Sequence, residues 1–414
     1  MHRARCRIVI EEARVKRAWI VVVAGALVVA LALQESAGSP SDSRLVSFWD
    51  EQRRGANFFN EVETRERIRA ARQAGIEWVR LVPDKWKAKG RDFLLGDAGS
   101  FGGLVPEDLA RLEQVLGWAE AEEMPVVVGM LNLPGCRWVQ QNGGVQDYRL
   151  WKDVRYQEQA AAFWKELASR LKDHPAVVAY NPLNEPHPER QAGHDGAEEP
   201  GFLEWLEAHR GTTADLDLFY ARIVRAIRDV DPHTPILVEG YGHGSVAGLT
   251  HLAPLDDPTI LYSFHFYDPW QYTARKANKG RYAYRDKMPA YWDGPAEKWE
   301  RDVLAGMMNP VEEWAKRNGI PASRVVAAEF GCDRGAPGAP EYLADILTTL
   351  NDRGWHWAFY SFREDAWDRM DYEVGPGPLG WTYWQAVERG EDPPRPWRDN
   401  PLWQVLQAGL RAER

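Results

Sequence analysis

Two glutamates stand just beyond apolar runs that have the character of buried strands. Residues 177–180 read Val-Val-Ala-Tyr and lead within a few residues to Asn184-Glu185-Pro186. Residues 325–328 read Val-Val-Ala-Ala and lead directly to Glu329-Phe330-Gly331. Such runs are typical of strands buried on both faces of a parallel sheet, and a carboxylate at the end of such a strand lies where α/β barrels carry their chemistry. Two carboxylates in these positions are the basic requirement of a retaining glycosidase.

The two glutamates would take different roles in that reaction. Glu185 is the expected general acid and base, so it must be protonated when it gives its proton to the departing oxygen. Glu329 is the expected nucleophile and must be ionised. In this mechanism the carboxyl groups lie about 5 Å apart, the nucleophile forms a glycosyl-enzyme, and the acid then activates water. Asn184, next to Glu185, could hydrogen-bond the 2-hydroxyl of the sugar.

Polar side chains at other predicted strand ends could support this pair. The positive charge of Arg80 would favour the ionised form of Glu329. Alternation along an extended strand places His265 and Tyr267 on one face, where Tyr267 could donate to Glu329 and His265 could hold Glu185 or a sugar hydroxyl. The alternatives are a structural salt bridge for Arg80 and a hydrogen-bonded core histidine for His265.

An alternation of strands and helices would position these residues. We predict strands at 55–59, 76–81, 125–131, 177–183, 236–238, 260–267, 325–328 and 355–362. We predict helices at 63–73, 106–122, 156–171, 215–229, 303–317, 340–353 and 401–414. Eight strands alternating with helices indicate an α/β fold, a single (β/α)8 TIM barrel that occupies residues 44–414.

The longer connections, 84–105, 132–153, 186–213 and 268–299, all follow predicted strands. They therefore belong at the carboxyl-terminal face of the barrel, where they would wall a cleft. Because sugar rings stack on flat aromatic faces, we expect some of the aromatic residues in these loops to line sugar subsites, while most of the 20 tryptophans fill the core. The loops carry Trp138, Trp151, Trp205, Trp270, Tyr272, Trp292 and Trp299.

The amino-terminal segment has the pattern of an export signal. Residues 1–17 are basic and residues 18–33 contain no charged side chain. This apolar run is short for a membrane span, which needs about 20 residues, and suits the core of a signal peptide. Residues 1–33 are either a signal peptide or an amino-terminal membrane anchor, and 34–43 read as a linker. Both alternatives predict export across a bacterial-type inner membrane, to a periplasmic, extracellular or anchored location.

Net charge and cysteine content limit the kinds of partner and ligand that we expect for this chain. A net charge of -10 gives no reason to expect nucleic acid, and a membrane is expected only through the amino-terminal segment. We expect a carbohydrate partner, no cofactor, no metal and a monomeric chain. The three cysteines, Cys6, Cys136 and Cys332, are too few and too scattered for a disulfide scaffold or a zinc site, and we predict free thiols.

The chain resembles glycoside hydrolase family 5, the cellulase-like family of clan A. The resemblance covers roughly residues 45–400 and implies a (β/α)8 barrel, a retaining mechanism, no cofactor and β-linked substrates. It implies that Glu185 is the acid/base, that Glu329 is the nucleophile, and that Arg80, Asn184, His265 and Tyr267 support them. The matching segments, in the order of the family, are Trp78-Val79-Arg80-Leu81, Asn184-Glu185-Pro186, His265-Phe266-Tyr267-Asp268-Pro269-Trp270 and Glu329-Phe330-Gly331.

Two departures from the family pattern fall near the first sugar subsite. The family usually has a histidine after the third strand, and here Leu131 or Asn132 takes its place. The family also commonly ends the eighth strand with a tryptophan that stacks on the sugar. Here Tyr360 or Phe362 is the expected substitute. Residues 363–365 and Trp367 could rebuild that wall, and Trp270 is a further substrate-binding candidate. These departures concern the substrate more than the reaction.

The leading hypothesis is an exported retaining β-glycosidase that hydrolyses O-glycosidic bonds of a β-linked poly- or oligosaccharide, as a cellulase or β-glucanase does. The sequence leaves open whether it acts as an endo-glucanase, a mannanase, an exo-acting glucosidase or an exopolysaccharide hydrolase. The alternative is a non-catalytic, membrane-anchored carbohydrate-binding barrel that serves polysaccharide assembly or export. A metal-dependent hydrolase would need clustered histidine and aspartate ligands, and His265 is the only histidine at a predicted strand end.

Overall fold

The computed structural model describes residues 45–86, 88, 90–289, 294–364, 367, 369–375, 382–394 and 400–412. Within the unit formed by Val46–Arg414, eight parallel strands close a barrel in the order β1-β10-β9-β6-β5-β4-β3-β2. The prediction of a (β/α)8 barrel is confirmed. The predicted signal or anchor at 1–33, the linker at 34–43, Cys6 and Trp292 lie outside the described residues.

Each predicted barrel strand is present, with its ends moved by a few residues. The observed strands are β1 (Arg54–Phe58), β2 (Trp78–Leu81), β3 (Val126–Gly129), β4 (Val177–Asn181), β5 (Ile236–Glu239), β6 (Ile260–Phe266), β9 (Val325–Phe330) and β10 (His356–Phe359). Every residue in these eight strands is buried. Burial on both faces explains why the strands read as continuous apolar runs rather than alternating ones.

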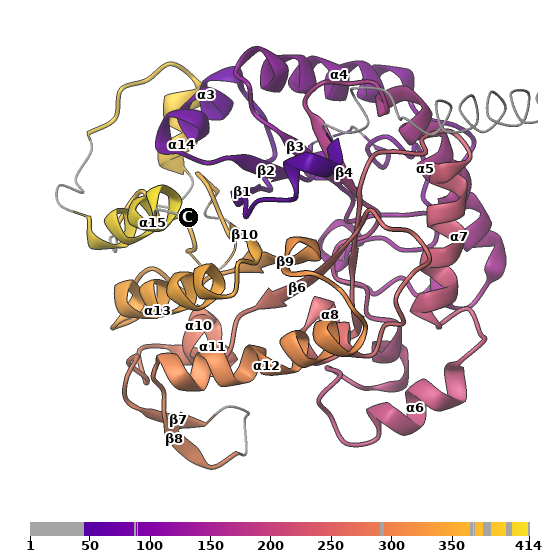
Figure 1. The fold of residues 1–414 in the computed structure, drawn as a ribbon. Coiled ribbons are helices and arrows are strands. Elements are labelled where there is room, and N and C mark those ends of the chain that lie inside the picture. The colour runs from indigo at the N-terminus through magenta and orange to yellow at the C-terminus, as the bar shows by residue number, and fades with distance from the viewer. Residues whose placement is uncertain are drawn as a thin grey trace, which may run out of the picture. The chain divides into compact units, whose positions relative to one another are not determined.

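Helices run around the outside of the barrel strands (Figure 1). Those that match the predicted ones are α3 (Arg65–Ala74), α4 (Pro106–Ala121), α5 (Val154–Leu171), α7 (Leu216–Arg228), α12 (Arg301–Arg317), α13 (Ala339–Asp352) and α15 (Pro401–Arg411). Helix α7 shows how the sequence sets them. Its buried residues recur at helical spacing from Leu216 to Ile227, and the Asp215 carboxylate caps its first turn by accepting from the N–H of Asp217.

The connections after the strands contain elements that the sequence reading did not predict. Among them are the helices α6 (Phe202–His209), α8 (Tyr241–Gly244), α9 (Val246–Thr250), α10 (Trp270–Thr273), α11 (Arg275–Asn278) and α14 (Thr382–Glu388), and an antiparallel pair formed by β7 (Lys287–Pro289) and β8 (Ala296–Lys298). The β7–β8 pair lies at the lower left of Figure 1, beside the barrel sheet rather than within it. These elements are short, so hydrophobic periodicity gives little signal for them.

Most of the tryptophans that the structure describes serve the core, as predicted. Trp49, Trp78, Trp86, Trp164, Trp299, Trp314 and Trp357 are fully buried. Cys136 and Cys332 are free and buried, also as predicted. Among the described residues, no helix combines the length and apolarity needed to cross a membrane.

Candidate active site

Glu185 and Glu329 meet at the carboxyl-terminal ends of the barrel strands. Glu329 is the next-to-last residue of β9, and Glu185 lies four residues beyond the end of β4. A carboxylate oxygen of Glu185 lies within 4.8 Å of a carboxylate oxygen of Glu329. The Glu329 side chain is buried, and that of Glu185 is 18% exposed. This separation suits a carboxylate pair that acts on the two sides of a single sugar carbon.

The backbone of Glu185 is held in an unusual conformation. Its φ is 51°, in the left-handed region that residues other than glycine seldom occupy. The N–H of Glu185 donates to Oε2 of Glu239 at 2.7 Å, which supplies a partner for this strained peptide. Strain of this kind, about 1–3 kcal/mol per residue, is typical of functional sites whose surroundings fix them. Glu239 therefore aims the Glu185 side chain through its backbone.

Arg80, on β2, holds the buried polar groups of the site together. One guanidinium nitrogen, Nη1, donates to Glu329 at 2.6 Å and to Asn57 at 3.2 Å. The other, Nη2, donates to Oε1 of Glu239 at 2.6 Å and to Oδ1 of Asn184 at 2.7 Å. The Arg80 side chain has no exposed surface. A planar guanidinium can serve several acceptors at fixed angles, which a lysine cannot do.

Arg80 also contacts the end of β4. Its Nε and Nη2 donate to the side-chain oxygen of Asn181 at 3.0 and 2.6 Å. The amide nitrogen of Asn57 in turn donates to the backbone oxygen of Ala328 at 2.8 Å, next to Glu329. Asn57 and Arg80 are register partners on β1 and β2, which explains their proximity. The sequence analysis did not propose Asn57 or Asn181 as site residues.

His265 and Tyr267 lie on the other side of the two glutamates. The Tyr267 hydroxyl donates to Oε2 of Glu329 at 2.8 Å. His265 Nδ1 lies 3.0 Å from Oε1 of Glu185 and 3.6 Å from Oε2 of Glu329, and its Nε2 lies 3.4 Å from Oε2 of Glu239. His265 and Glu329 are register partners on β6 and β9. The structure thus brings His265 and Tyr267 into contact with the two glutamates.

The buried charges shift one another's pKa values. Burial alone would lower the pKa of His265, but the carboxylates of Glu329 and Glu239 outweigh it and raise that pKa to about 10. Burial would raise the pKa of Glu239, but the charges of His265 and Arg80 lower it to about 2. The site therefore contains an imidazolium and a permanently ionised carboxylate at neutral pH.

The pKa of Glu329 is set by a different balance between burial and nearby charges. Its burial raises its pKa above the usual value, and the nearby charges of His265 and Arg80 oppose that effect without cancelling it. The hydrogen bonds from Arg80 and Tyr267 both favour the ionised form. A carboxylate with these donors and little contact with solvent suits a nucleophile, because the donors orient it and it is only weakly hydrated.

Glu239 is the main residue that sequence reasoning missed. It is the last residue of β5 and has no exposed surface. A signal was present, because Ile236-Leu237-Val238 is an apolar run that ends in Glu239-Gly240, much as the run at 325–328 ends in Glu329-Phe330-Gly331. The predicted strand stops at Val238, one residue short of Glu239.

The two candidates after the third strand have different positions. Leu131 lines the cavity beside Glu329. The side chain of Asn132 is used within its own loop, where it donates to Asp84 at 3.0 Å and to Gln141 and accepts from the N–H of Trp138 at 2.6 Å. The buried Asn132 amide therefore fixes the loop, and an apolar leucine stands at the cavity wall.

Aromatic residues from two loops form one wall of the site. Trp367 packs edge-on against Tyr360 and Tyr267, with ring centroids 5.5 and 5.3 Å away. Its ring also lies 6.0 Å from that of Trp270, which is 40% exposed. Tyr360, at the end of β10, donates its hydroxyl to Oε2 of Glu364 at 2.9 Å. The structure thus brings Tyr360, Trp367 and Trp270 together, whereas Phe362 packs on Trp403 away from this wall.

Two cavities meet at Glu185. The inner cavity, about 100 Å³, is lined by Glu185 and Glu329 together with Phe59, Lys85 and Tyr360. The outer cavity, about 510 Å³, is lined by Glu185 with residues such as Arg190, His243 and Trp270. Of the loop aromatics proposed from sequence, Trp138 and Trp270 line a cavity. Others are packed inside: Trp151, Trp205, Tyr272 and Trp299 are buried.

Glu185, His265 and Glu329 offer potential ligand atoms within 4.8 Å of one another, as a metal site would require. The donor set does not fit a divalent cation. Glu329 already accepts from the Arg80 guanidinium at 2.6 Å, and the raised pKa of His265 keeps its ring protonated and unable to ligate. The cluster is better suited to moving protons than to holding a metal.

Comparison with known proteins agrees with this geometry. A family model described as "Cellulase (glycosyl hydrolase family 5)" matches residues 38–366. Endoglucanase C of Acetivibrio thermocellus is 25% identical over 264 residues, which are 63% of this chain and 63% of that protein. An endoglucanase of Paenibacillus polymyxa is 30% identical over 159 residues, which are 35% of this chain and 36% of that protein. The chain thus spans less than two thirds of the length of these relatives.

Solved structures share the fold. Thermotoga maritima Cel5A in complex with cellobiose aligns with a TM-score of 0.58 at 18% identity, over 87% of this chain and 99% of that chain. Pseudomonas stutzeri endoglucanase Cel5A in complex with cellobiose aligns with a TM-score of 0.56 at 19% identity, over 86% and 92% of the two chains. Since the family model matches more than half of the residues, this chain belongs to glycosyl hydrolase family 5.

Proposed function

We propose that the chain is an exported retaining β-glycosidase that hydrolyses O-glycosidic bonds of a β-linked poly- or oligosaccharide. Glu185 is the general acid and base, and Glu329 is the nucleophile. The observation that carries this proposal is the placement of the two carboxylates within 4.8 Å of each other at the ends of β4 and β9. Membership of family 5 and the endoglucanase relatives support it.

The reaction runs in two displacements. The ionised Glu329 attacks the anomeric carbon of the sugar, the glycosidic C–O bond breaks, and its electron pair stays on the departing oxygen, which takes the proton of Glu185. A water molecule then gives a proton to the Glu185 carboxylate and adds its oxygen to the anomeric carbon. The bond to Glu329 breaks in this step, so the sugar leaves with its original configuration.

The neighbouring residues have matching tasks. Arg80 and Tyr267 hold Glu329 ionised and oriented through hydrogen bonds at 2.6 and 2.8 Å. His265 lies 3.0 Å from Glu185, and as an imidazolium it balances the negative charge that Glu185 gains after it has lost its proton. Asn184 lines the inner cavity, where its amide can reach the 2-hydroxyl of the sugar.

Export is proposed from the sequence of residues 1–33, a basic segment followed by an apolar one. The proposal places the catalytic unit in the periplasm, outside the cell, or at the membrane surface on an uncleaved anchor. The expected partner is a carbohydrate, and the chain is proposed to act as a monomer.

A fluoroglycoside experiment tests the activity. The protein is incubated with 2-deoxy-2-fluoro-β-glycosides of glucose, mannose and xylose that carry a dinitrophenyl leaving group, and the digest is analysed by mass spectrometry. Covalent addition of the fluorosugar at Glu329 is expected, because the fluorine slows the second displacement more than the activated first one. Absence of any adduct, together with no hydrolysis of a panel of β-linked polysaccharides, would sink the proposal and favour a non-catalytic carbohydrate-binding barrel.

Matched variants assign the roles. Glu329→Gln should lose hydrolysis of every substrate. Glu185→Gln should lose about 10²–10⁴-fold on substrates with poor leaving groups, the usual contribution of a general acid, and much less on dinitrophenyl glycosides. Glu113→Gln, on α4 with a side chain 40% exposed, is the control and should behave as the unmodified protein.

A further inference from the structure

The two cavities at Glu185 differ about fivefold in volume, at about 100 and 510 Å³. Glu329 bonds to the sugar that stays on the enzyme, so this sugar occupies the inner cavity that both glutamates line. Glu185 gives its proton to the oxygen of the departing part, which must extend into the outer cavity. The site therefore offers little room on the side of the retained sugar and much room on the side of the leaving group.

Lys85, which lines the inner cavity, forms an ion pair with Glu364, which lines a third cavity. Lys85 Nζ lies 3.8 Å from Oε1 of Glu364, and the two side chains are 19% and 5% exposed. Lys85 ends the short 3-10 helix η1 (Pro83–Lys85) that follows β2, and Glu364 follows β10. Strands β2 and β10 flank β1 in the barrel, and Phe59 comes directly after β1. Lys85, Phe59 and Glu364 thus form a barrier over three adjacent strand ends.

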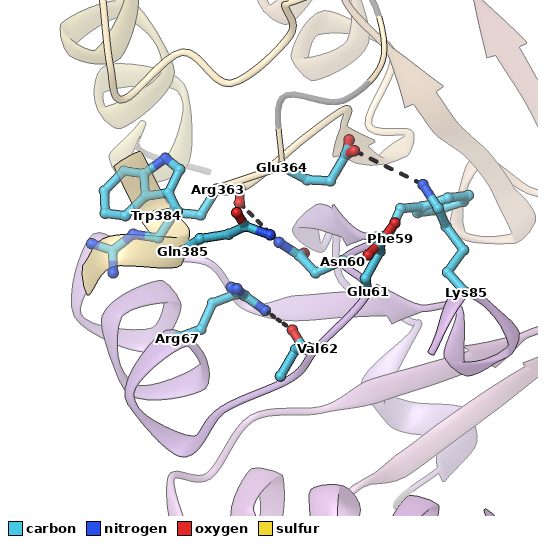
Figure 2. A pocket seen from close by; sticks show the side chains of 10 residues that line it. All are labelled: Phe59, Asn60, Glu61, Val62, Arg67, Lys85, Arg363, Glu364, Trp384 and Gln385. Atoms are coloured by element: carbon cyan, nitrogen blue, oxygen red, sulfur yellow. Dashed lines mark hydrogen bonds and ion pairs between the residues drawn. The ribbon is translucent and has the colours of Figure 1, made fainter. Parts of the chain in front are cut away.

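A third cavity lies beyond this barrier. It measures about 60 Å³ and shares Phe59 and Lys85 with the inner cavity. Figure 2 shows Lys85 and Glu364 facing each other at one end of this third cavity, with Trp384 at the opposite end. Phe59 and Lys85 therefore lie between the inner and third cavities.

The barrier is fixed on both of its sides. Oε2 of Glu364 accepts from the Tyr360 hydroxyl at 2.9 Å, and its backbone oxygen accepts from the Ser361 hydroxyl at 2.6 Å. Lys85 Nζ lies 5.6 Å from the centroid of the Phe59 ring, within range of a cation–π contact. A largely buried ion pair with these additional contacts resists displacement by a sugar, because separating it would leave a buried charge without a partner.

We propose that the Lys85–Glu364 barrier limits the retained side of the site to one sugar residue. The enzyme then removes single sugars from the non-reducing ends of β-linked chains, and the outer cavity holds the rest of the chain as leaving group. This inference rests on the proposed glycosidase function and adds exo-action to it. Lys85 and Glu364 are specificity-determining residues in this account.

Nitrophenyl β-glycosides test the barrier in the unmodified protein. They are used as monosaccharide and disaccharide pairs in the gluco, manno and xylo series. Nitrophenol should appear at once from a monosaccharide glycoside. From the disaccharide glycoside it should appear only after a lag, because the first cut releases one sugar and leaves a nitrophenyl monosaccharide. Nitrophenol released at once with free disaccharide as first product would overturn the inference.

Variants of Lys85 test whether the barrier causes the limit to one sugar residue. Lys85→Ala should join the inner and third cavities, shorten the lag, and raise the ratio of disaccharide to monosaccharide among the first products by about tenfold, the scale of a steric change in a binding pocket. Lys85→Arg retains the charge and reach and should keep the lag. Lys165→Ala, an exposed residue on α5, is the control. An unchanged product ratio in Lys85→Ala would refute the role of the barrier.

The outcomes separate this inference from the function beneath it. If none of these glycosides releases nitrophenol, no fluorosugar labels Glu329 and no β-linked polysaccharide is hydrolysed, the glycosidase function itself fails and the inference fails with it. If the disaccharide glycosides are cut directly to disaccharide and nitrophenol, the function stands and exo-action is excluded.

Discussion

The side chain of Glu239 accepts a hydrogen bond at 2.7 Å from the backbone N–H of Glu185. Its other carboxylate oxygen accepts from Arg80 at 2.6 Å. Glu239 therefore connects Glu185, which lies beyond β4, to Arg80, which donates to Glu329. A third carboxylate with no exposed surface sets the positions of the two that are proposed to react.

Replacing Glu239 tests this connection. Glu239→Gln retains the shape but removes the negative charge between Arg80 and His265, and its amide can no longer offer two acceptor oxygens. Breaking a buried ion pair costs about 3–5 kcal/mol, so the free energy of unfolding should fall by that order. Denaturant unfolding measures the loss. Activity on glycosides with poor leaving groups should also fall, because Glu185 loses its anchor. A variant as stable and active as the unmodified protein would contradict this role.

The charge of His265 predicts how stability depends on pH. Its pKa is raised from 6.5 to about 10 in the folded chain. A group with a raised folded pKa stabilises the fold fully below pH 6.5, and this contribution is lost as the pH rises toward about 10. The free energy of unfolding should therefore fall over that window more steeply in the unmodified protein than in His265→Gln. Urea titrations at several pH values measure both slopes, and equal slopes would refute the prediction.

Arg80→Lys should impair the proposed nucleophile, Glu329, even though the substitution preserves the positive charge. A lysine keeps one positive charge but cannot donate to Glu329 and Glu239 in the geometry of the guanidinium. Because the charge of Arg80 lowers the pKa of Glu329 against its burial, weakening that contact should move the acid limb of the pH profile of kcat/KM to higher pH. That limb reports an apparent pKa of the coupled site. A fall in kcat of about 10²–10³-fold is expected for a lost charge-stabilising donor, and an unmoved limb would argue against this role.

Removing metal ions should leave hydrolysis unchanged. The three residues that converge as metal ligands would are Glu185, His265 and Glu329. Two positive charges already lie at this cluster, the Arg80 guanidinium and the His265 imidazolium, and they leave no favourable place for a metal cation. Protein dialysed against EDTA and assayed in EDTA should retain its rate on any substrate that it hydrolyses. Lost activity that returns with a divalent cation would overturn the assignment of these residues to acid–base and nucleophilic roles.

The barrel and the central residues were predictable from sequence because both depend on short-range patterns. Strands buried on two faces are apolar throughout, so their ends are easy to find, and Glu329 and Arg80 each occupy the next-to-last position of such a strand. The contact between Glu329 and His265 was less predictable, because the β6–β9 register shifts between Phe264 and His265 and only this shift brings His265 opposite Glu329. Glu239 was not predicted as a site residue because the predicted strand ended one residue too early, at Val238, which left its carboxylate outside the strand.

Side chains in the loops could not be assigned in this way. Leu131 and Asn132 are adjacent and equally plausible in sequence, and only the contacts of Asn132 with Asp84, Gln141 and Trp138 show which of them turns away from the cavity. The same holds for Lys85 and Glu364, which are 279 positions apart in the chain and meet only because β2 and β10 both flank β1. Loop conformation depends on contacts between distant segments, and no local periodicity encodes those contacts.

The pairing of β1 with β10 has a consequence for how the chain folds during synthesis. Arg80 lies on β2, Glu185 follows β4 and Glu329 lies on β9, so the site draws on segments spread along the sequence. The ring closes only when the last strand, β10, pairs with the first, β1. Under the proposed function, a chain emerging from the ribosome is therefore expected to hydrolyse no glycan until His356–Phe359 has been made and has paired with β1. In refolding from denaturant, the return of catalysis should coincide with ring closure and follow the earlier appearance of helical signal.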